Sequence, residues 1–161
     1  MGRLERSLYY VLNVGVRLLL RSPLRSPLHG LASGRIMLLT VTGRKSRRRF
    51  TVPVSYLHHE GRLLSFTSGE WSAWWKNLRE GAPVAARVQG RQLAGSAWAE
   101  TGRDAVVQGL GTFLTEFPGT AGRYGVGLDA GGRPDPREVD AAVRGGRAVM
   151  VVVKPKAPEA C

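Results

Sequence analysis

The fold is decided by the stretch FTVPVSY at residues 50–56, in which large apolar side chains alternate with small or polar ones. A period of two is typical of a strand with one face in the core and the other toward solvent. The apolar, β-branched run 36–42 precedes it and ends at Gly43. We therefore expect two neighbouring strands joined by a tight turn.

Further strand patterns follow along the chain. The segment 63–67 returns after a turn at 58–61, 84–88 and 92–98 flank a Gln-Gly turn, and 148–153 has the continuous apolar pattern of a buried strand. Six strands in antiparallel order, with helices at the ends, predict a small β-rich barrel of the α+β class.

Helical patterns lie around these strands. We expect a helix at 4–21, a short one at 72–79 with Ser72 as N-cap, and one at 106–116. The run Asp135-Pro136-Arg137-Glu138 opens another, with a cap, Pro at N1 and Glu at N3.

The length of 161 residues fits one domain, which we divide into an N-terminal amphipathic helix (1–24) and a cofactor-binding barrel (25–158). The apolar stretch 8–20 is too short for a membrane span, and no secretory signal is seen. The single cysteine, Cys161, permits no disulfide framework, so we expect a cytoplasmic protein. Residues 1–24 either pack on the barrel, join a partner subunit in a homodimer, or rest on an anionic inner membrane face.

Positive charge is concentrated in the first third of the chain. The formal net charge is +12, and residues 1–59 hold eleven Lys or Arg and one acid, Glu5, which gives that stretch +10. A partner with several negative charges is expected there. Nucleic acid, an acidic membrane surface and a phosphorylated cofactor all satisfy this requirement.

The run TGRKSRRR at 42–49 is the strongest local feature, because five of its residues are cations at a turn between two strands. Charge-assisted hydrogen bonds from such a turn suit phosphate or carboxylate. The spacing is not that of a Walker loop, and the alternative is a solvated hairpin turn.

A second feature is the tryptophan cluster that follows the segment 67–69. Trp71, Trp74 and Trp75 lie within five residues, and such side chains are either buried or cover something flat. Core packing is expected for Trp74 and Leu78, and ligand contact for the segment 75–77.

Catalytic side-chain patterns are missing from the sequence. It holds no Ser-His-Asp set, no paired carboxylates and no metal-ligand spacing, and its three histidines are expected at the surface. A redox cofactor enzyme needs none of these, because the cofactor supplies the reactivity.

Several of these pieces together resemble the deazaflavin-dependent nitroreductase family. They are LLTVTGRKS at 38–46, PVSY at 53–56, WWKNL at 74–78 and Pro83-Val84, and the resemblance covers about residues 30–155. It implies a split β-barrel of the FMN-binding type that binds coenzyme F420, a deazaflavin with a phosphate and an oligoglutamate tail.

The resemblance also implies roles for particular residues. The basic turn would hold the anionic tail, two segments would line the deazaflavin, and a residue after Phe117-Pro118 would close the substrate pocket. The cofactor-binding candidates are Arg44, Lys45, Ser46, Arg49, Pro53, Val54, Ser55, Thr67, Ser68, Gly69, Trp75, Lys76 and Asn77, and the catalytic candidate is Tyr124.

Two departures from the family pattern stand out. The loop between Gly69 and Trp74 is short, and residue 47 is Arg where the family usually has Gly. The short loop leaves open a changed cofactor, such as FMN or haem.

The leading hypothesis is an oxidoreductase that moves hydride between reduced F420 and a small planar acceptor, such as a quinone or nitroaromatic. A non-catalytic flavin- or haem-binding barrel is the alternative. Nucleic-acid binding is disfavoured, because the aromatic residues gather at 71–75 rather than among the cations of the turn.

Overall fold

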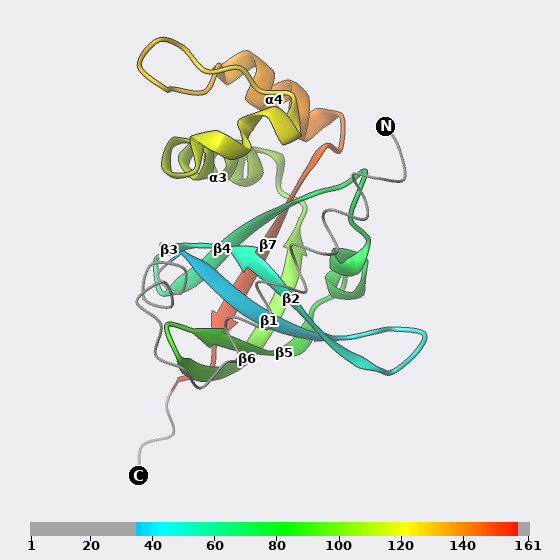
Figure 1. Ribbon diagram of the computed structural model, residues 1–161. Helices are drawn as coiled ribbons and strands as arrows, with labels where there is room; N and C mark the ends of the chain where they lie inside the picture. Colours follow the sequence, from blue (N-terminus) through cyan, green and yellow to red (C-terminus); the bar gives the residue numbers. More distant parts are fainter. Residues whose placement is uncertain (1–34, 158–161) are drawn as a thin grey trace, which may run out of the picture.

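Seven strands form one curled antiparallel sheet in the computed structural model, which describes residues 35–157 (Figure 1). Their order across the sheet is β2-β1-β5-β6-β7-β4-β3. Their bounds are β1 Ile36–Thr42, β2 Arg49–Ser55, β3 Leu57–His59, β4 Arg62–Ser68, β5 Ala82–Val88, β6 Arg91–Glu100 and β7 Ala148–Pro155. The predicted β-rich split barrel is confirmed.

Two of the predicted hairpins form as the sequence indicates. Strands β1 and β2 pair from Ile36 opposite Ser55 to Thr42 opposite Arg49. Between β5 and β6, Gln89 and Gly90 have φ values of 48° and 79°, the left-handed pair that a two-residue hairpin turn requires.

The segment 58–61 is only partly the turn that we predicted. His58 and His59 belong to the short strand β3, which pairs with β4, and the turn itself is Glu60-Gly61. Both histidines are exposed, as expected. Strands β2 and β3 thus form one bent ribbon that pairs first with β1 and then with β4.

The centre of the molecule is the pair β4–β7, which is buried on both faces. Met150 and Val152 point into a hydrophobic cluster on the helix side, whereas Val151 and Val153 point into a second cluster inside the curl of the sheet. Successive side chains of a strand point to opposite faces, and both faces of β7 are buried. Every position is therefore apolar, which explains the continuous apolar pattern at 148–153.

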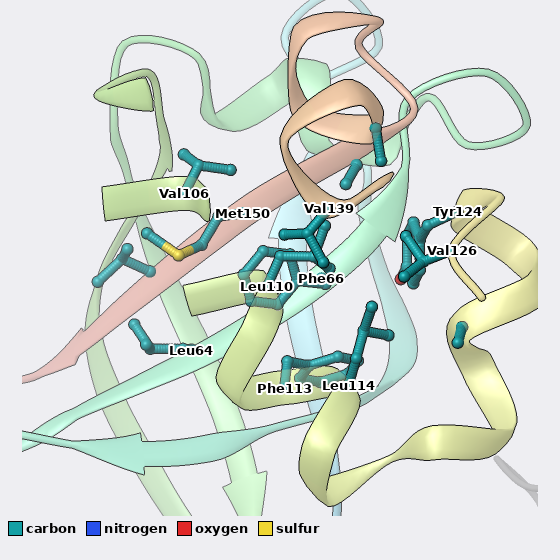
Figure 2. Close-up of a cluster of buried hydrophobic side chains, with 14 residues drawn as sticks. Leu64, Phe66, Val106, Leu110, Phe113, Leu114, Tyr124, Val126, Val139 and Met150 are labelled. Atoms are coloured by element: carbon teal, nitrogen blue, oxygen red, sulfur yellow. The ribbon is translucent and has the colours of Figure 1, made fainter. Parts of the chain in front are cut away.

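Helices α3 (Arg103–Glu116), η2 (Pro118–Tyr124) and α4 (Pro136–Arg144) cover the helix side of the sheet (Figure 1). Figure 2 shows Leu110, Phe113 and Leu114 of α3 meeting Phe66 and Met150 of the strands. A Cβ on Gly109 would lie 2.7 Å from Met150 Sδ, so this glycine allows the helix to approach the sheet closely.

Two capping predictions have different outcomes. Asp135 caps α4 as predicted, because its side chain accepts a hydrogen bond of 2.8 Å from the backbone N–H of Arg137. The Glu138 carboxylate instead accepts from the N–H of Gly127. Ser72 is not an N-cap, since the predicted helix at 72–79 is a shorter 3-10 helix, η1 (Trp74–Leu78), that follows Ala73 without a side-chain cap.

The predicted helix at 4–21 and the proposed contacts of residues 1–24 lie outside the described residues. Within 35–157, none of the helices is long and apolar enough to cross a membrane.

Candidate functional site

The turn between β1 and β2 is a closed loop with five exposed cations. The N–H of Gly43 donates to the carbonyl of Arg48, and the N–H of Arg47 donates back to the carbonyl of Gly43, both at 2.9 Å. The turn projects from the sheet away from α3 and α4 (Figure 1). Its exposed cations are Arg44, Lys45, Arg47, Arg48 and Arg49, which we call the basic turn.

Arg47 adopts a φ of 57°, in the left-handed region that favours glycine. The departure noted in the sequence therefore falls at the one position of the basic turn where a glycine would relieve backbone strain. The chain accepts that strain and gains a fifth cation.

Asn77 ties the basic turn to η1 across 33 residues of sequence. Its Oδ1 accepts a hydrogen bond of 3.0 Å from the N–H of Arg44, and its Nδ2 donates to the carbonyl of Trp74 at 2.9 Å. Both ends of the amide are therefore engaged in fixing the turn on η1. This geometry gives Asn77 a positioning role.

Negative charge is scarce around the basic turn. Within residues 35–157, no ion pair joins any of its five cations to a carboxylate. Uncompensated cations and a pre-formed turn attract an anion without a large conformational cost.

Strand β2 places the segment 53–55 opposite residues 36–38 of β1, at the end of the hairpin away from the basic turn. Pro53 lies opposite Leu38 of β1, and Val54 is buried inside the curl, while Pro53 and Ser55 are half-buried. Proline is tolerated here because the other edge of β2 pairs with no strand of the described chain. Strand β2 also approaches β4.

The end of β4 is held by its own side chains and by β7. The Ser68 hydroxyl accepts from the N–H groups of Glu70 and Trp71, each at 3.3 Å, and Thr67 is buried. The N–H of Gly69 donates to the carbonyl of Arg147 at 3.1 Å. A Cβ on Gly69 would fall 2.0 Å from the Gly146 carbonyl oxygen, so only glycine fits there.

The tryptophans of the cluster differ in burial. Leu78 is fully buried and Trp74 packs against the inner cluster, as predicted, whereas Trp71 is 54% exposed. The Trp75 indole donates to the carbonyl of Ser72 at 2.9 Å. The Arg79 guanidinium lies 5.0 Å from the Trp75 ring centroid and the Lys76 ammonium 5.9 Å, so two cations accompany this ring.

Sequence reasoning missed Arg79, although its position four residues after Trp75 on a predicted helix was a usable signal. It also left Arg48 and the strained Arg47 outside the candidate site.

Tyr124 lies apart from these segments. It is 4% exposed and belongs to the helix-side cluster, where Figure 2 shows it beside Val126. The other candidates lie on the basic turn, β2, the end of β4 and η1, and the Arg44–Asn77 hydrogen bond joins the basic turn to η1. Its predicted contact with substrate stays a prediction.

The thirteen cofactor-binding candidates include no histidine, cysteine, aspartate or glutamate. They combine a cationic turn fixed by Asn77 with the Trp75 ring, which the Lys76 ammonium accompanies. This arrangement suits a flat ligand that carries an anionic tail, with the reactivity supplied by the ligand itself.

Comparison with known proteins places the chain among reductases. The family model described as F420H(2)-dependent quinone reductase matches residues 26–109. No curated protein matches the chain.

Solved structures share its fold at low sequence identity. A putative pyridoxamine 5'-phosphate oxidase from Listeria innocua is 12% identical with a TM-score of 0.51, covering 80% of this chain and 90% of its own. A protein of unknown function from Agrobacterium tumefaciens is 13% identical with a TM-score of 0.55, covering 84% and 59%. An F420-H2 dependent reductase, FDR-A, is 17% identical with a TM-score of 0.50, covering 73% and 93%.

Proposed function

Because the chain belongs to the family of F420H(2)-dependent quinone reductases, we propose that it transfers hydride from reduced F420 to a small planar acceptor of the quinone or nitroaromatic type. The chain is an oxidoreductase, and its cofactor is F420 rather than FMN or haem. When bound, F420 supplies the hydride. The protein's part is to hold, orient and shield it.

The single observation that carries the assignment of the site is the basic turn. Its five exposed cations have no carboxylate partner within 35–157, and hydrogen bonds within the turn and to Asn77 fix its shape. An anionic tail of phosphate and glutamates would meet donors that are already arranged. Arg44, Lys45, Ser46 and Arg49 are the residues that we assign to this tail.

For the flat ring we assign the segments 53–55 and 67–69, together with Trp75 and Lys76. The approach of β2 to β4 supports this assignment, since the two segments belong to these two strands. The hydrogen bond from the Gly69 N–H to the Arg147 carbonyl and the close approach of Gly69 to Gly146 hold the end of β4 against β7.

Cofactor titration tests this assignment. The F420 fluorescence of the full chain would be titrated for wild type, Lys45→Ala and Arg91→Ala at low and high salt. Loss of one charged hydrogen bond should cost about 1.5–3 kcal/mol, or roughly ten- to a hundredfold in Kd. Arg91 is an exposed cation at the start of β6, so its removal controls for net charge.

The effect of Lys45→Ala should shrink at high salt, because exposed charges are screened. Equal F420 affinities of wild type and Lys45→Ala at both salt concentrations would show that the basic turn does not bind the anionic tail. The acceptor is tested separately, by following the oxidation of reduced F420 with a soluble naphthoquinone and a nitroaromatic. Tight cofactor binding without oxidation by either compound would contradict the proposed reaction.

A further inference from the structure

A second site lies where the helical layer meets η1. A cavity of about 520 Å³ opens between Trp75 and Arg79 of the η1 segment, the start of α3 and the end of α4. This volume is in the range of small-molecule sites, roughly 300–1,000 Å³. Of the residues assigned to the cofactor, only Trp75 also lines the cavity.

The floor of the cavity is apolar. Val106 of α3, Val143 of α4 and Val149 of β7 line it, and Ala99 and Ala148 lie between them. Val106 and Ala148 are buried, so these walls belong to the folded core and are already formed. Such a floor favours a ligand with an apolar body over a bare phosphate.

Besides Arg79, three charged residues line the cavity, and each already has partners: Glu100, Arg103 and Arg144. The Arg103 guanidinium and the Arg144 guanidinium both bind the Asp140 carboxylate, at 2.6 Å and 2.8 Å. The Glu100 carboxylate accepts from the N–H groups of Thr101 and Gly102 at 3.0 and 2.9 Å, which helps to hold its pKa below the usual value.

Arg79 is the exception. Among the described residues it has no carboxylate partner, and its guanidinium lies over the Trp75 ring. The paired N–H groups of a guanidinium fit the two oxygens of a carboxylate. The cavity therefore combines an apolar floor with one uncommitted, oriented cation.

We propose that this cavity binds a small aromatic carboxylate, with its flat apolar body on the valine floor and its carboxylate on Arg79. The site is separate from the basic turn but adjoins it through η1, because Trp75 lies two residues before Asn77. A ligand in the cavity would therefore contact η1, the element whose Asn77 holds the basic turn in place.

Calorimetric titration of the full chain with 2-naphthoate tests the proposal, with uncharged 2-naphthamide as the comparison ligand. Wild type should bind naphthoate saturably and one-to-one, and naphthamide at least about tenfold more weakly, because the amide lacks the charge. Arg79→Ala should lose about tenfold or more in naphthoate affinity, and Arg79→Lys should lose less, since it keeps the charge without the planar fork.

Two controls make the result specific. Arg91→Ala removes an equally exposed cation elsewhere and should leave binding unchanged. Arg79 is exposed, so Arg79→Ala should unfold at the wild-type temperature. Saturating F420 should not displace naphthoate.

Three outcomes would each overturn the proposal: no saturable binding, equal affinity of wild type and Arg79→Ala, or competitive displacement by F420. The last would assign the anion to the cofactor site instead. A failure of F420 itself to bind would leave the cavity result intact, so the two proposals are tested independently.

Discussion

The basic turn and the helix-side cluster are opposite in almost every physical respect. The turn is exposed and strained at Arg47, and hydrogen bonds fix its shape, whereas α3 packs the buried side chains of Leu110, Phe113 and Leu114 against the sheet. The basic turn carries strain and exposed charge, whereas the helix-side cluster stabilises the fold. The contrast teaches that ligand binding and folding can be perturbed separately in this chain.

The largest effect is expected from Phe113→Ala. Phe113 is 2% exposed, and its ring centroid lies 5.0 Å from that of Phe66 and 4.7 Å from that of Phe117. Removing the ring should destabilise the fold by about 3–5 kcal/mol, through lost burial and a residual cavity. Urea unfolding measures the loss, and F420 affinity below the transition should stay near wild type. A matching loss of affinity would show that the two regions are coupled.

Asn77→Ala should weaken F420 binding by about five- to tenfold, the worth of a hydrogen bond near 1 kcal/mol that positions the turn. Because the amide is uncharged, the loss should persist at high salt, whereas the loss in Lys45→Ala should fade. Titration of both variants at two salt concentrations separates positioning from charge. A salt-sensitive loss in Asn77→Ala would mean that the amide acts through the cations alone.

Tyr124→Phe asks which region this residue serves. If it contacts the substrate, as predicted from the sequence, turnover should fall severalfold while F420 affinity and stability hold. If its hydroxyl serves the helix-side cluster, stability should fall by about 1 kcal/mol with turnover unchanged. Thermal unfolding and quinone reduction on the same preparation decide between the two roles, and loss of cofactor affinity would exclude both.

Arg47→Gly should have the smallest effect on stability and the opposite sign. Relief of the left-handed strain should stabilise the fold by about 0.5–1 kcal/mol, partly offset by the greater freedom of glycine in the unfolded chain. F420 affinity should fall, because a cation is lost. Arg48→Gly is the matched control: it removes the same charge without a positive φ to relieve, so it should not stabilise. Stabilisation by both variants would point to charge repulsion within the turn instead.

The fold could be predicted from the sequence wherever one physical signal dominated. Period two at 50–56 and the apolar run at 148–153 correspond to β2 and β7, and Asp135 capped its helix. Strand β3 was missed because His58 and His59 are polar and exposed, so a strand held by pairing alone resembled a turn. The start of α3 at Arg103 was placed three residues late, because its first turn is exposed and polar.

The site was less predictable, because its decisive contacts join distant parts of the chain. The bond between Arg44 and Asn77 spans 33 residues, and no local pattern encodes it. The strain at Arg47 depends on a φ angle that only the closed turn imposes. The contact of Arg79 with Trp75 could have been proposed from their spacing of four on the predicted helix, although η1 is a 3-10 helix that ends at Leu78.

The burial of β4 and β7 on both faces has a consequence for amide hydrogen exchange. Amide protons in these strands should be the last to exchange with deuterated solvent, since exposing them requires global unfolding. Those of the basic turn should exchange early, through local opening. Cofactor bound only to the closed turn would slow that early exchange in proportion to its occupancy. Deuterium uptake in the basic turn would then report cofactor binding, while β4 and β7 remain protected over the same period.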